Sequence, residues 1–390
     1  MAKISLSTYT FNDASLVNGL LAAIPSWTVI PDEIVITDDG SETPFVPDAC
    51  YPSSLPAPRI LRLDENMGFT NAKHTGVGAT TGEVFISMDS DARPDPNFLE
   101  CCLAHLKKPE VGMAGGNSLV SAGPGSIGQY LRLYGDNYTV SETGPVEFIP
   151  GPAWAMRRAV WDEVGGFSSH TRRNCGDRAL CALLRKKGYQ LIADANTRVF
   201  QVRRLTRHIQ MRRIWLWCGP PLASSIVDEA SLPDQLMAIF GKAIVGRAEN
   251  AAELQSLILL YYELLMLPYL AFEFCAYPGL WERLPVGMPG RLFAALEEKL
   301  AAYPRLWRLL QRDLTALRVL PLQAHPTLPE KENAPPLGTR TDWSSCLSFI
   351  DSFAQSGALN WLNTEGMRIL LEEDAERQSD FSAYLKAKPI

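Results

Sequence analysis

The sequence predicts an α/β protein, with a mostly parallel sheet in its first half and a mainly α-helical second half. Two observations support this prediction. Up to about residue 215, short apolar runs alternate with stretches of helical spacing, and strands separated by helices in this way form βαβ units. After about residue 220 the strand pattern fades, and long helical patterns continue to about residue 320.

The strands expected in the first half end in polar residues. They are "ISLSTYT" (4–10), "DEIVITDDGS" (32–41), "RILRLDENMG" (59–68) and "GEVFISMDSD" (82–91), followed by a strand at 111–119. Ligands of parallel sheets bind beyond the carboxyl ends of the strands. We therefore expect the acids of these separate segments to converge at one edge of the sheet.

Helices are expected between these strands, at 14–24, 70–80 and 95–106. Asp95 is a suitable cap for the third helix, with Pro96 at its first position, where proline is favoured. Farther along, the sequence predicts a strand, a tight loop and a short helix at 148–167, and then a helix and a strand at 174–200.

The expected domain boundary divides the chain into 1–218 and 219–390, with a proline-rich loop at 325–342. The apolar stretch at 254–281 resembles a membrane span, but two glutamates and a proline interrupt it. Because charged side chains are costly at bilayer depth, we expect buried core helices there, and peripheral membrane association stays open.

Composition excludes some classes of function. The formal net charge of −6 argues against nucleic acid as a partner. The eight cysteines form no C-x-x-C pair, which fits reduced thiols and excludes a zinc knuckle. The N-terminus shows no apolar segment of secretory length. The expected location is therefore the cytoplasm, with the inner face of the membrane as the alternative.

Six ordered motifs in the first half resemble those of the family 2 glycosyltransferases. They are "TYTFND", "ITDDGS", "NMGFTNAKHTG", "MDSDARPDP", "GPAWAMRRAVWDEVGGF" and "GDRALCALLRKKGY". The resemblance covers about residues 1–215. It implies a GT-A fold, which is a Rossmann-like sheet, and an inverting, metal-dependent transfer of a sugar from a nucleotide diphosphate donor to an acceptor hydroxyl.

The resemblance also implies the partners and the metal. The donor would be a UDP-sugar, the acceptor a glycan, a lipid-linked group or a protein, and the setting surface-glycan or glycoconjugate assembly. The D-x-D motif is Asp89-Ser90-Asp91, in which Asp91 would bind Mn²⁺ or Mg²⁺ while Asp89 and Ser90 would contact sugar or ribose. In an extended segment both carboxylates would point the same way. A polar turn after a strand is the plainer alternative.

Further positions match the nucleotide-sugar site of the family. Asp39, beside Asp38, would hold the nucleotide base, although "DG" is also a turn former. The remaining positions would line the nucleotide, diphosphate and sugar, and they are Thr8, Tyr9, Asn71, Lys73, Gly151 and Trp154. Asn71 and Lys73 could equally be solvated helix residues, and Trp154 a core residue.

Asp177 matches the acid that the family uses as its general base, although Gly176 stands where a glutamate is usual. An N-cap is the alternative role for Asp177. The histidine that often completes the metal site is replaced by Gln201, which leaves His208 as the candidate ligand. In the basic run 203–213, Arg207 is a candidate for a diphosphate clamp, whereas Arg203 and Arg204 fit a solvated helix.

Two other functions stay open from the sequence. A catalytically degenerate chain would act as a binding or scaffold module, which Gly176 and the missing histidine favour. A sugar nucleotidyltransferase should have a glycine-rich loop after its first strand, and "STYTFND" is not such a loop.

Overall fold

The structure is a computed structural model that describes residues 2–121, 125–134, 137–167, 176–203, 205–211, 213–214, 254–275, 288–319 and 343–375. These residues form two compact units. One comprises 1–123 and 131–204, and the other comprises 124–130 and 205–389. The expected boundary at 218/219 and the proline-rich loop 325–342 lie outside the described residues.

A mixed sheet, with as many parallel as antiparallel strand pairs, forms the centre of the first unit, in the strand order β3-β2-β1-β4-β8-β6-β9-β5. Strand β8 is antiparallel to β4 and β6, and β5 and β7 are antiparallel to β9. The strands are β1 (Ile4–Thr10), β2 (Glu33–Asp38), β3 (Arg59–Arg62), β4 (Val84–Met88), β5 (Ala92–Pro94), β6 (Val111–Val120), β7 (Gly144–Val146), β8 (Ala153–Arg157) and β9 (Gln190–Gln201).

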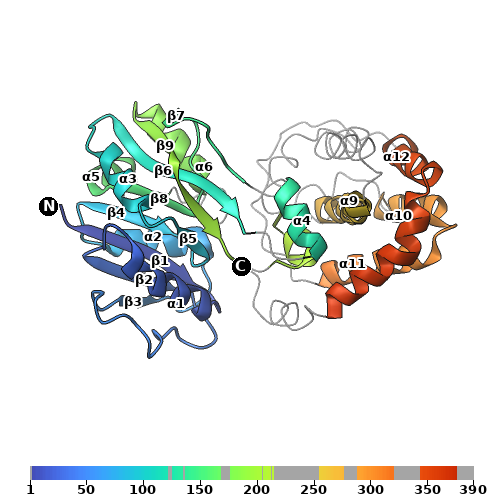
Figure 1. Ribbon diagram of the computed structural model, residues 1–390, viewed down its shortest axis with the longest axis horizontal. Helices are drawn as coiled ribbons and strands as arrows, with labels where there is room; N and C mark the ends of the chain where they lie inside the picture. The colour runs from blue at the N-terminus through green and yellow to red at the C-terminus, as the bar shows by residue number, and fades with distance from the viewer. Residues whose placement is uncertain are drawn as a thin grey trace, which may run out of the picture. The chain divides into compact units, whose positions relative to one another are not determined.

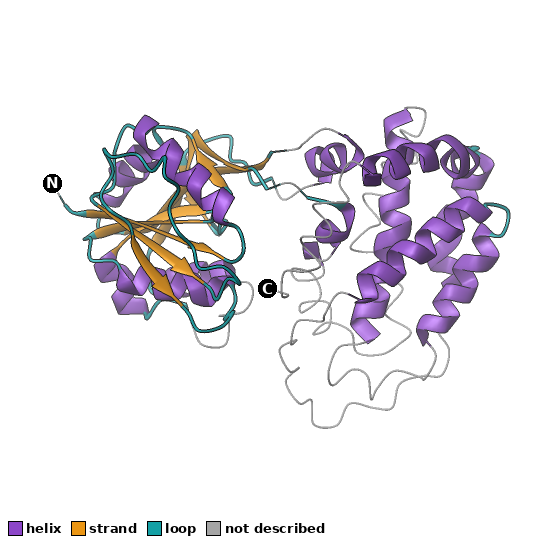
Figure 2. Cartoon of the chain, turned by 90° about the horizontal axis from the view of Figure 1, so that it is seen from below, coloured by secondary structure: helices purple, strands orange, loops and turns teal. Residues whose placement is uncertain are grey.

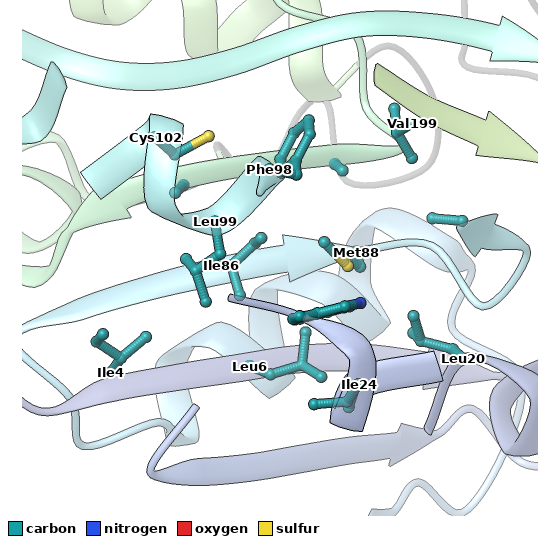
Figure 3. Packing of buried hydrophobic residues seen from close by; sticks show 14 of the residues in the cluster. Ile4, Leu6, Leu20, Ile24, Ile86, Met88, Phe98, Leu99, Cys102 and Val199 are labelled. Atoms are coloured by element: carbon teal, nitrogen blue, oxygen red, sulfur yellow. The ribbon is translucent and has the colours of Figure 1, made fainter. Parts of the chain in front are cut away.

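Helices cover both faces of this sheet, as Figure 2 shows for the first unit. One face packs against α1 (Ala14–Ala23) and α3 (Phe98–Leu106), and the other packs against α2 (Phe69–Ala79), α5 (Arg158–Val164) and α6 (Gly176–Lys186). Figure 3 shows the first of these layers, in which Ile86 of β4 lies beside Leu99 of α3 and Leu6 of β1 lies beside Ile24. The expected α/β architecture is confirmed (Figure 1).

The second unit is helical in its described residues. Its helices are α9 (Leu254–Cys275), α10 (Met288–Leu300), α11 (Pro304–Val319), α12 (Trp343–Gln355) and α13 (Ala358–Trp361), with η4 (Leu362–Gly366) and the first part of α4 (Gly125–Tyr134). Every residue of α9 from 258 to 271 is buried, because this helix is apolar on all sides. The expected buried helix is confirmed, and none of the helices within the described ranges could cross a membrane.

One local expectation is wrong. Helix α3 begins at Phe98 with Asn97 as its N-cap, so Asp95 and Pro96 precede the helix. The Asp95 carboxylate instead accepts hydrogen bonds from the backbone and the guanidinium of Arg198 on β9, at 3.0 and 2.9 Å. The Asp95 carboxylate, which the local pattern assigns to a helix cap, is therefore bound to a residue distant in sequence.

Candidate functional site

The parallel strands β1, β2 and β4 bring their carboxyl ends to one edge of the sheet, as the sequence predicts. Strand β8 is antiparallel to β4, so the segment that precedes it reaches the same edge. There the backbone N–H of Asp89 donates to the carbonyl of Pro152 at 2.9 Å. The D-x-D motif and the "GP" of 151–152 are therefore neighbours.

A chain of polar contacts connects four of the expected site residues. Lys73 of α2 is buried and places its Nζ 2.6 Å from Oδ1 of Asp89 and 2.8 Å from the carbonyl oxygen of Gly151. The Tyr9 hydroxyl donates to the same Asp89 oxygen at 3.2 Å. Burial raises the pKa of Tyr9, and the Asp89 carboxylate adds to this, so the phenol stays protonated as a donor. The Lys73 side chain is thus buried and paired rather than solvated.

The same chain of contacts reaches Asp177. The backbone N–H of Gly151 donates to Oδ2 of Asp177 at 3.1 Å, while Oδ1 accepts from the N–H of Arg178 at 2.9 Å. A Cβ at position 151 would lie 3.3 Å from both that carboxylate oxygen and Nζ of Lys73. Glycine therefore permits this close approach. Asp177 lies in the first turn of α6 and is partly exposed, so its carboxylate is both positioned and accessible.

The D-x-D motif is a turn rather than the extended segment expected, because the N–H of Ala92 donates to the carbonyl of Asp89 at 3.0 Å. Its two acids have different cationic partners as a result. Lys73 pairs with Asp89, whereas Arg203 places Nε 3.2 Å from Oδ2 of Asp91 and Nη2 2.6 Å from Oδ2 of Asp13. Burial and the neighbouring Asp91 raise the pKa of Asp89 against the effect of Lys73.

The two acids after β2 are also held differently. Asp38 accepts from the backbone of Ser41 and Phe45 and pairs with Arg62 at 2.6 Å. Burial opposes ionisation of Asp38, but these hydrogen bonds and the guanidinium together lower its pKa. This carboxylate is occupied in holding its own loop.

Asp39 accepts from the backbone N–H groups of Met67 and Gly68, at 2.8 and 3.0 Å. Burial nevertheless raises its pKa to about 6. Asn71 donates its side-chain amide to the carbonyl of Met67 at 2.8 Å. Asp39 and Asn71 thus both bind the backbone of the 67–68 segment. The Met67 side chain itself is exposed.

Two expected residues are placed in the interior. Trp154 is 1% exposed, and its ring packs against Phe85, Trp161 and Phe167 in the core. The structure therefore gives its indole a core role instead of an open face for a sugar. Thr8 is also buried, and its hydroxyl has no hydrogen-bond partner. Ser90, between the two acids of the motif, is buried as well.

Arg207 and His208 are engaged by acids of the helical unit. Arg207 donates Nε to Oδ2 of Asp313 at 2.8 Å and Nη2 to Oδ2 of Asp374 at 2.6 Å. His208 lies 3.3 Å from the other Asp313 oxygen. Hydrogen bonds from His208 and the charge of Arg207 overcome burial and hold the pKa of Asp313 well below its usual range. These contacts of Arg207 and His208 hold the helical unit together and do not point to a diphosphate or a metal ion. The Gln201 side-chain amide donates to Oγ of Ser118 at 3.4 Å.

Carboxylate oxygens are the ligands that a hard divalent ion prefers. Asp13 and Asp91 supply such oxygens close together, because both carboxylates contact the Arg203 guanidinium. These oxygens are few in number. Within the described ranges, no group of three or more histidine, cysteine, aspartate or glutamate side chains could hold a metal. Sequence reasoning did not place Asp13 here, and it assigned Arg203 to a solvated helix, whereas Arg203 lies outside any helix and pairs with two acids. The one available signal was the basic run following β9.

Comparison with known proteins gives partial matches to two glycosyltransferases. The O-antigen chain rhamnosyltransferase of Salmonella typhimurium is 26% identical over 200 residues, which cover 48% of this chain and 63% of that protein. The pre-mycofactocin glycosyltransferase of Mycobacterium tuberculosis is 27% identical over 166 residues, covering 40% of this chain and 35% of that protein. The matches thus span less than two thirds of either relative.

A mannosyltransferase structure from Pyrobaculum calidifontis is 20% identical, with a TM-score of 0.40 and coverage of 82% of this chain and 86% of that one. The family model described as Glycosyl transferase family 2 matches residues 5–165, which contain β1 to α5 and the D-x-D turn. The match ends before α6, whereas the resemblance of the motifs extends to about residue 215. Residues 5–165 of this chain therefore match glycosyl transferase family 2, which confirms the resemblance over these residues and agrees with the expected GT-A-like fold class.

Proposed function

We propose that this protein is an inverting glycosyltransferase that moves a sugar from a nucleotide diphosphate donor to an acceptor hydroxyl. The observation that supports this best is the connected set of contacts from Tyr9 through Asp89, Lys73 and Gly151 to Asp177. It places a lysine cation, a glycine backbone and a partly exposed carboxylate at one edge of the sheet. These are the groups that a donor diphosphate, a donor sugar and an acceptor hydroxyl require.

In this proposal Asp177 is the general base. The N–H of Gly151 orients one of its oxygens, and its partial exposure lets an acceptor hydroxyl approach. The carboxylate takes the hydroxyl proton as the acceptor oxygen attacks the anomeric carbon from the face opposite the diphosphate. The new bond forms as the bond to the diphosphate breaks, so the configuration at that carbon inverts.

Lys73 contributes positive charge close to the same edge. Asp89 and the carbonyl of Gly151 hold its ammonium group in place, so little reorganisation is needed when phosphate binds. Asp91, with Asp13 beside it, would hold Mn²⁺ or Mg²⁺, which when bound supplies charge that stabilises the leaving diphosphate. Asp39 would accept an N–H of the nucleotide base, for which we propose uracil.

The acceptor that we propose is part of a surface glycan or glycoconjugate, presented as a glycan, a lipid-linked group or a protein. The name of the Salmonella relative, an O-antigen chain rhamnosyltransferase, supports this setting. We propose a catalytic domain within 1–218 and a helical domain at 219–390, to which the described residues of 205–214 also belong by their contacts.

Calorimetric titration of UDP and GDP, with and without Mn²⁺, tests the donor site. We expect UDP to bind, and to bind more tightly with Mn²⁺ present. A screen of UDP-sugars for donor hydrolysis then identifies the sugar. Absence of any nucleotide binding would remove the basis for a donor site.

The base assignment is tested with Asp177→Asn. We expect turnover to fall by about 100-fold or more, the usual contribution of a general base, while UDP affinity stays unchanged. Asp162→Asn is the matched control, because its side chain is 62% exposed on α5. Full turnover by Asp177→Asn would show that another group takes the proton.

A binding or scaffold module is the second candidate. One observation favours it, since both acids of the D-x-D turn already have protein cations as partners. A scaffold would bind a nucleotide or glycan without hydrolysing any nucleotide sugar, whereas a transferase should slowly hydrolyse its donor. The hydrolysis screen therefore separates the two functions.

A further inference from the structure

Arg203 is held next to Asp91 by the backbone. The N–H of Val202 donates to the carbonyl of Asp91 at 2.9 Å, and β9 ends at Gln201, which pairs in register with Ala92 of β5. Val202 is therefore fixed beside the D-x-D turn by its backbone, and Arg203, the next residue, starts from the same place. Only the side chain of Arg203 needs to move to uncover or cover the Asp91 carboxylate.

The guanidinium of Arg203 lies between the carboxylates of Asp91, in this turn, and Asp13. It contacts Asp91 through Nε at 3.2 Å and Asp13 through Nη2 at 2.6 Å, and Nη2 also lies 3.5 Å from Oγ of Ser90. One positive charge thus serves two carboxylates. Its contact with Asp91 uses a single nitrogen, so it lacks the paired geometry in which arginine binds one carboxylate most strongly.

Exposure separates this ion pair from the one at Asp89. The Lys73 side chain is only 5% exposed, whereas that of Arg203 is 30% exposed. Part of the Arg203 side chain is therefore in contact with solvent, whereas the Lys73 side chain is enclosed. Of the two cations at the motif, Arg203 is the one that can exchange.

We propose that Arg203 is the protein's own cation at Asp91 and competes there with the divalent ion. The proposal rests on the proposed function, in which Asp91 is the metal ligand. A divalent ion that arrives alone meets a guanidinium beside its carboxylate and is repelled. When the ion arrives with a nucleotide diphosphate, the phosphates supply negative charge that the displaced guanidinium can pair with. Arg203 is thus a positioning residue that makes tight metal binding conditional on the donor.

The test measures metal binding directly and without nucleotide. Free Mn²⁺ is followed by electron paramagnetic resonance as the full-length protein is titrated, for wild type, Arg203→Met and Arg203→Gln. We expect both variants to bind Mn²⁺ about tenfold more tightly than wild type or better, because removal of one partner leaves partly buried carboxylates without a cation. The glutamine variant keeps a hydrogen-bonding side chain, so it remains informative if the methionine variant does not fold.

Two controls make the result specific. Arg198→Met also removes an arginine ion pair from β9, the one with Asp95, and should leave Mn²⁺ affinity unchanged. Arg203→Lys keeps the positive charge and should stay close to wild type. Circular dichroism melting establishes that each variant is folded.

Unchanged Mn²⁺ affinity in the folded Arg203→Met or Arg203→Gln variant would overturn the proposal, as would equal tightening in Arg203→Lys. Failure of the proposed function gives a different result, because it is read from UDP binding by the wild-type protein. If UDP binds to wild type while loss of the guanidinium leaves Mn²⁺ affinity unchanged, only the role of Arg203 is wrong.

Discussion

Replacing Lys73 with methionine tests whether the polar chain of contacts at the sheet edge is a coupled unit. Methionine keeps most of the length of the side chain and removes its charge. The substitution leaves Asp89, whose side chain is 20% exposed, without the ammonium group at 2.6 Å, and leaves the carbonyl of Gly151 without its donor at 2.8 Å. Breaking a buried ion pair from one side costs about 3–5 kcal/mol, and the partial exposure of Asp89 places the expected loss near the lower end, about 3 kcal/mol.

The size of this loss should depend on pH. Burial already raises the pKa of Asp89, and loss of Lys73 removes the main group that opposes this. A carboxyl whose pKa is higher in the folded chain than in the unfolded chain costs stability as pH rises from its unfolded value, about 3.9, through its folded value. Lys73→Met should therefore be most destabilising near pH 8 and least destabilising near pH 4, where Asp89 is protonated.

Urea unfolding followed by circular dichroism at both pH values measures these effects. In an Asp89→Asn background the cost of Lys73→Met should fall to about 1 kcal/mol, the value of one hydrogen bond. Lys187→Met, at an exposed position after α6, should change the free energy of unfolding by less than about 0.5 kcal/mol. The coupling between Lys73 and Asp89 would be refuted if Lys73→Met cost no more than Lys187→Met. It would also be refuted if the cost of Lys73→Met did not depend on pH or on the presence of Asp89.

Three other predictions concern separate parts of the chain. Gly76→Ala should destabilise by about 1–3 kcal/mol, because its Cβ would meet hydroxyls of β1 and β2 at 2.6 Å, whereas Gly78→Ala in the same helix has no neighbour within 4 Å and should be neutral or stabilising in urea unfolding. Burial raises the pKa of Asp39 to about 6, so uridine, which has no phosphate to titrate, should bind more weakly below that pH, and a calorimetric profile that is flat from pH 5 to 8 would exclude base binding through this carboxylate. Asp313→Asn should cost about 3 kcal/mol near pH 7, and the cost should begin to decline only below about pH 4, because a lowered folded pKa gives stability that is present above the unfolded value and is lost as pH falls from there toward the folded value. Asp351→Asn, at a side chain 52% exposed, is the control in thermal melting.

Most of the first unit could be predicted from the sequence, because its strands are apolar runs with clear turn signals and its helices lie between them. The convergence of the acids at 38–39 and 89–91 follows from parallel pairing alone. The alternation of residues along β8 does not reveal which layer covers which face. That is why Trp154 was a plausible sugar contact in the sequence and is a core residue in the structure.

The parts that could not be predicted depend on partners distant in sequence. Asp95 looks like a helix cap until Arg198 comes within 2.9 Å, and His208 looks like a metal ligand until Asp313 lies beside it. A side chain with several possible partners takes the one that the fold brings nearest, and spacing along the chain carries no information on that. The same limit applies to Lys73, whose burial against Asp89 joins residues 16 positions apart through the packing of α2 on the sheet.

The two acids of the D-x-D turn illustrate how the structure sharpens a motif. Each has a cation, but the cations differ in kind. Lys73 is enclosed and also bonds the backbone of Gly151, so displacing it from Asp89 would disturb the segment that orients Asp177. Arg203 is partly open to solvent and shares its charge between Asp91 and Asp13, so displacing it breaks these two ion pairs but leaves the contacts of Gly151 and Asp177 intact. In the proposed mechanism, a metal would therefore replace the cation at Asp91, while the ion pair at Asp89 keeps Asp177, the proposed base, in place.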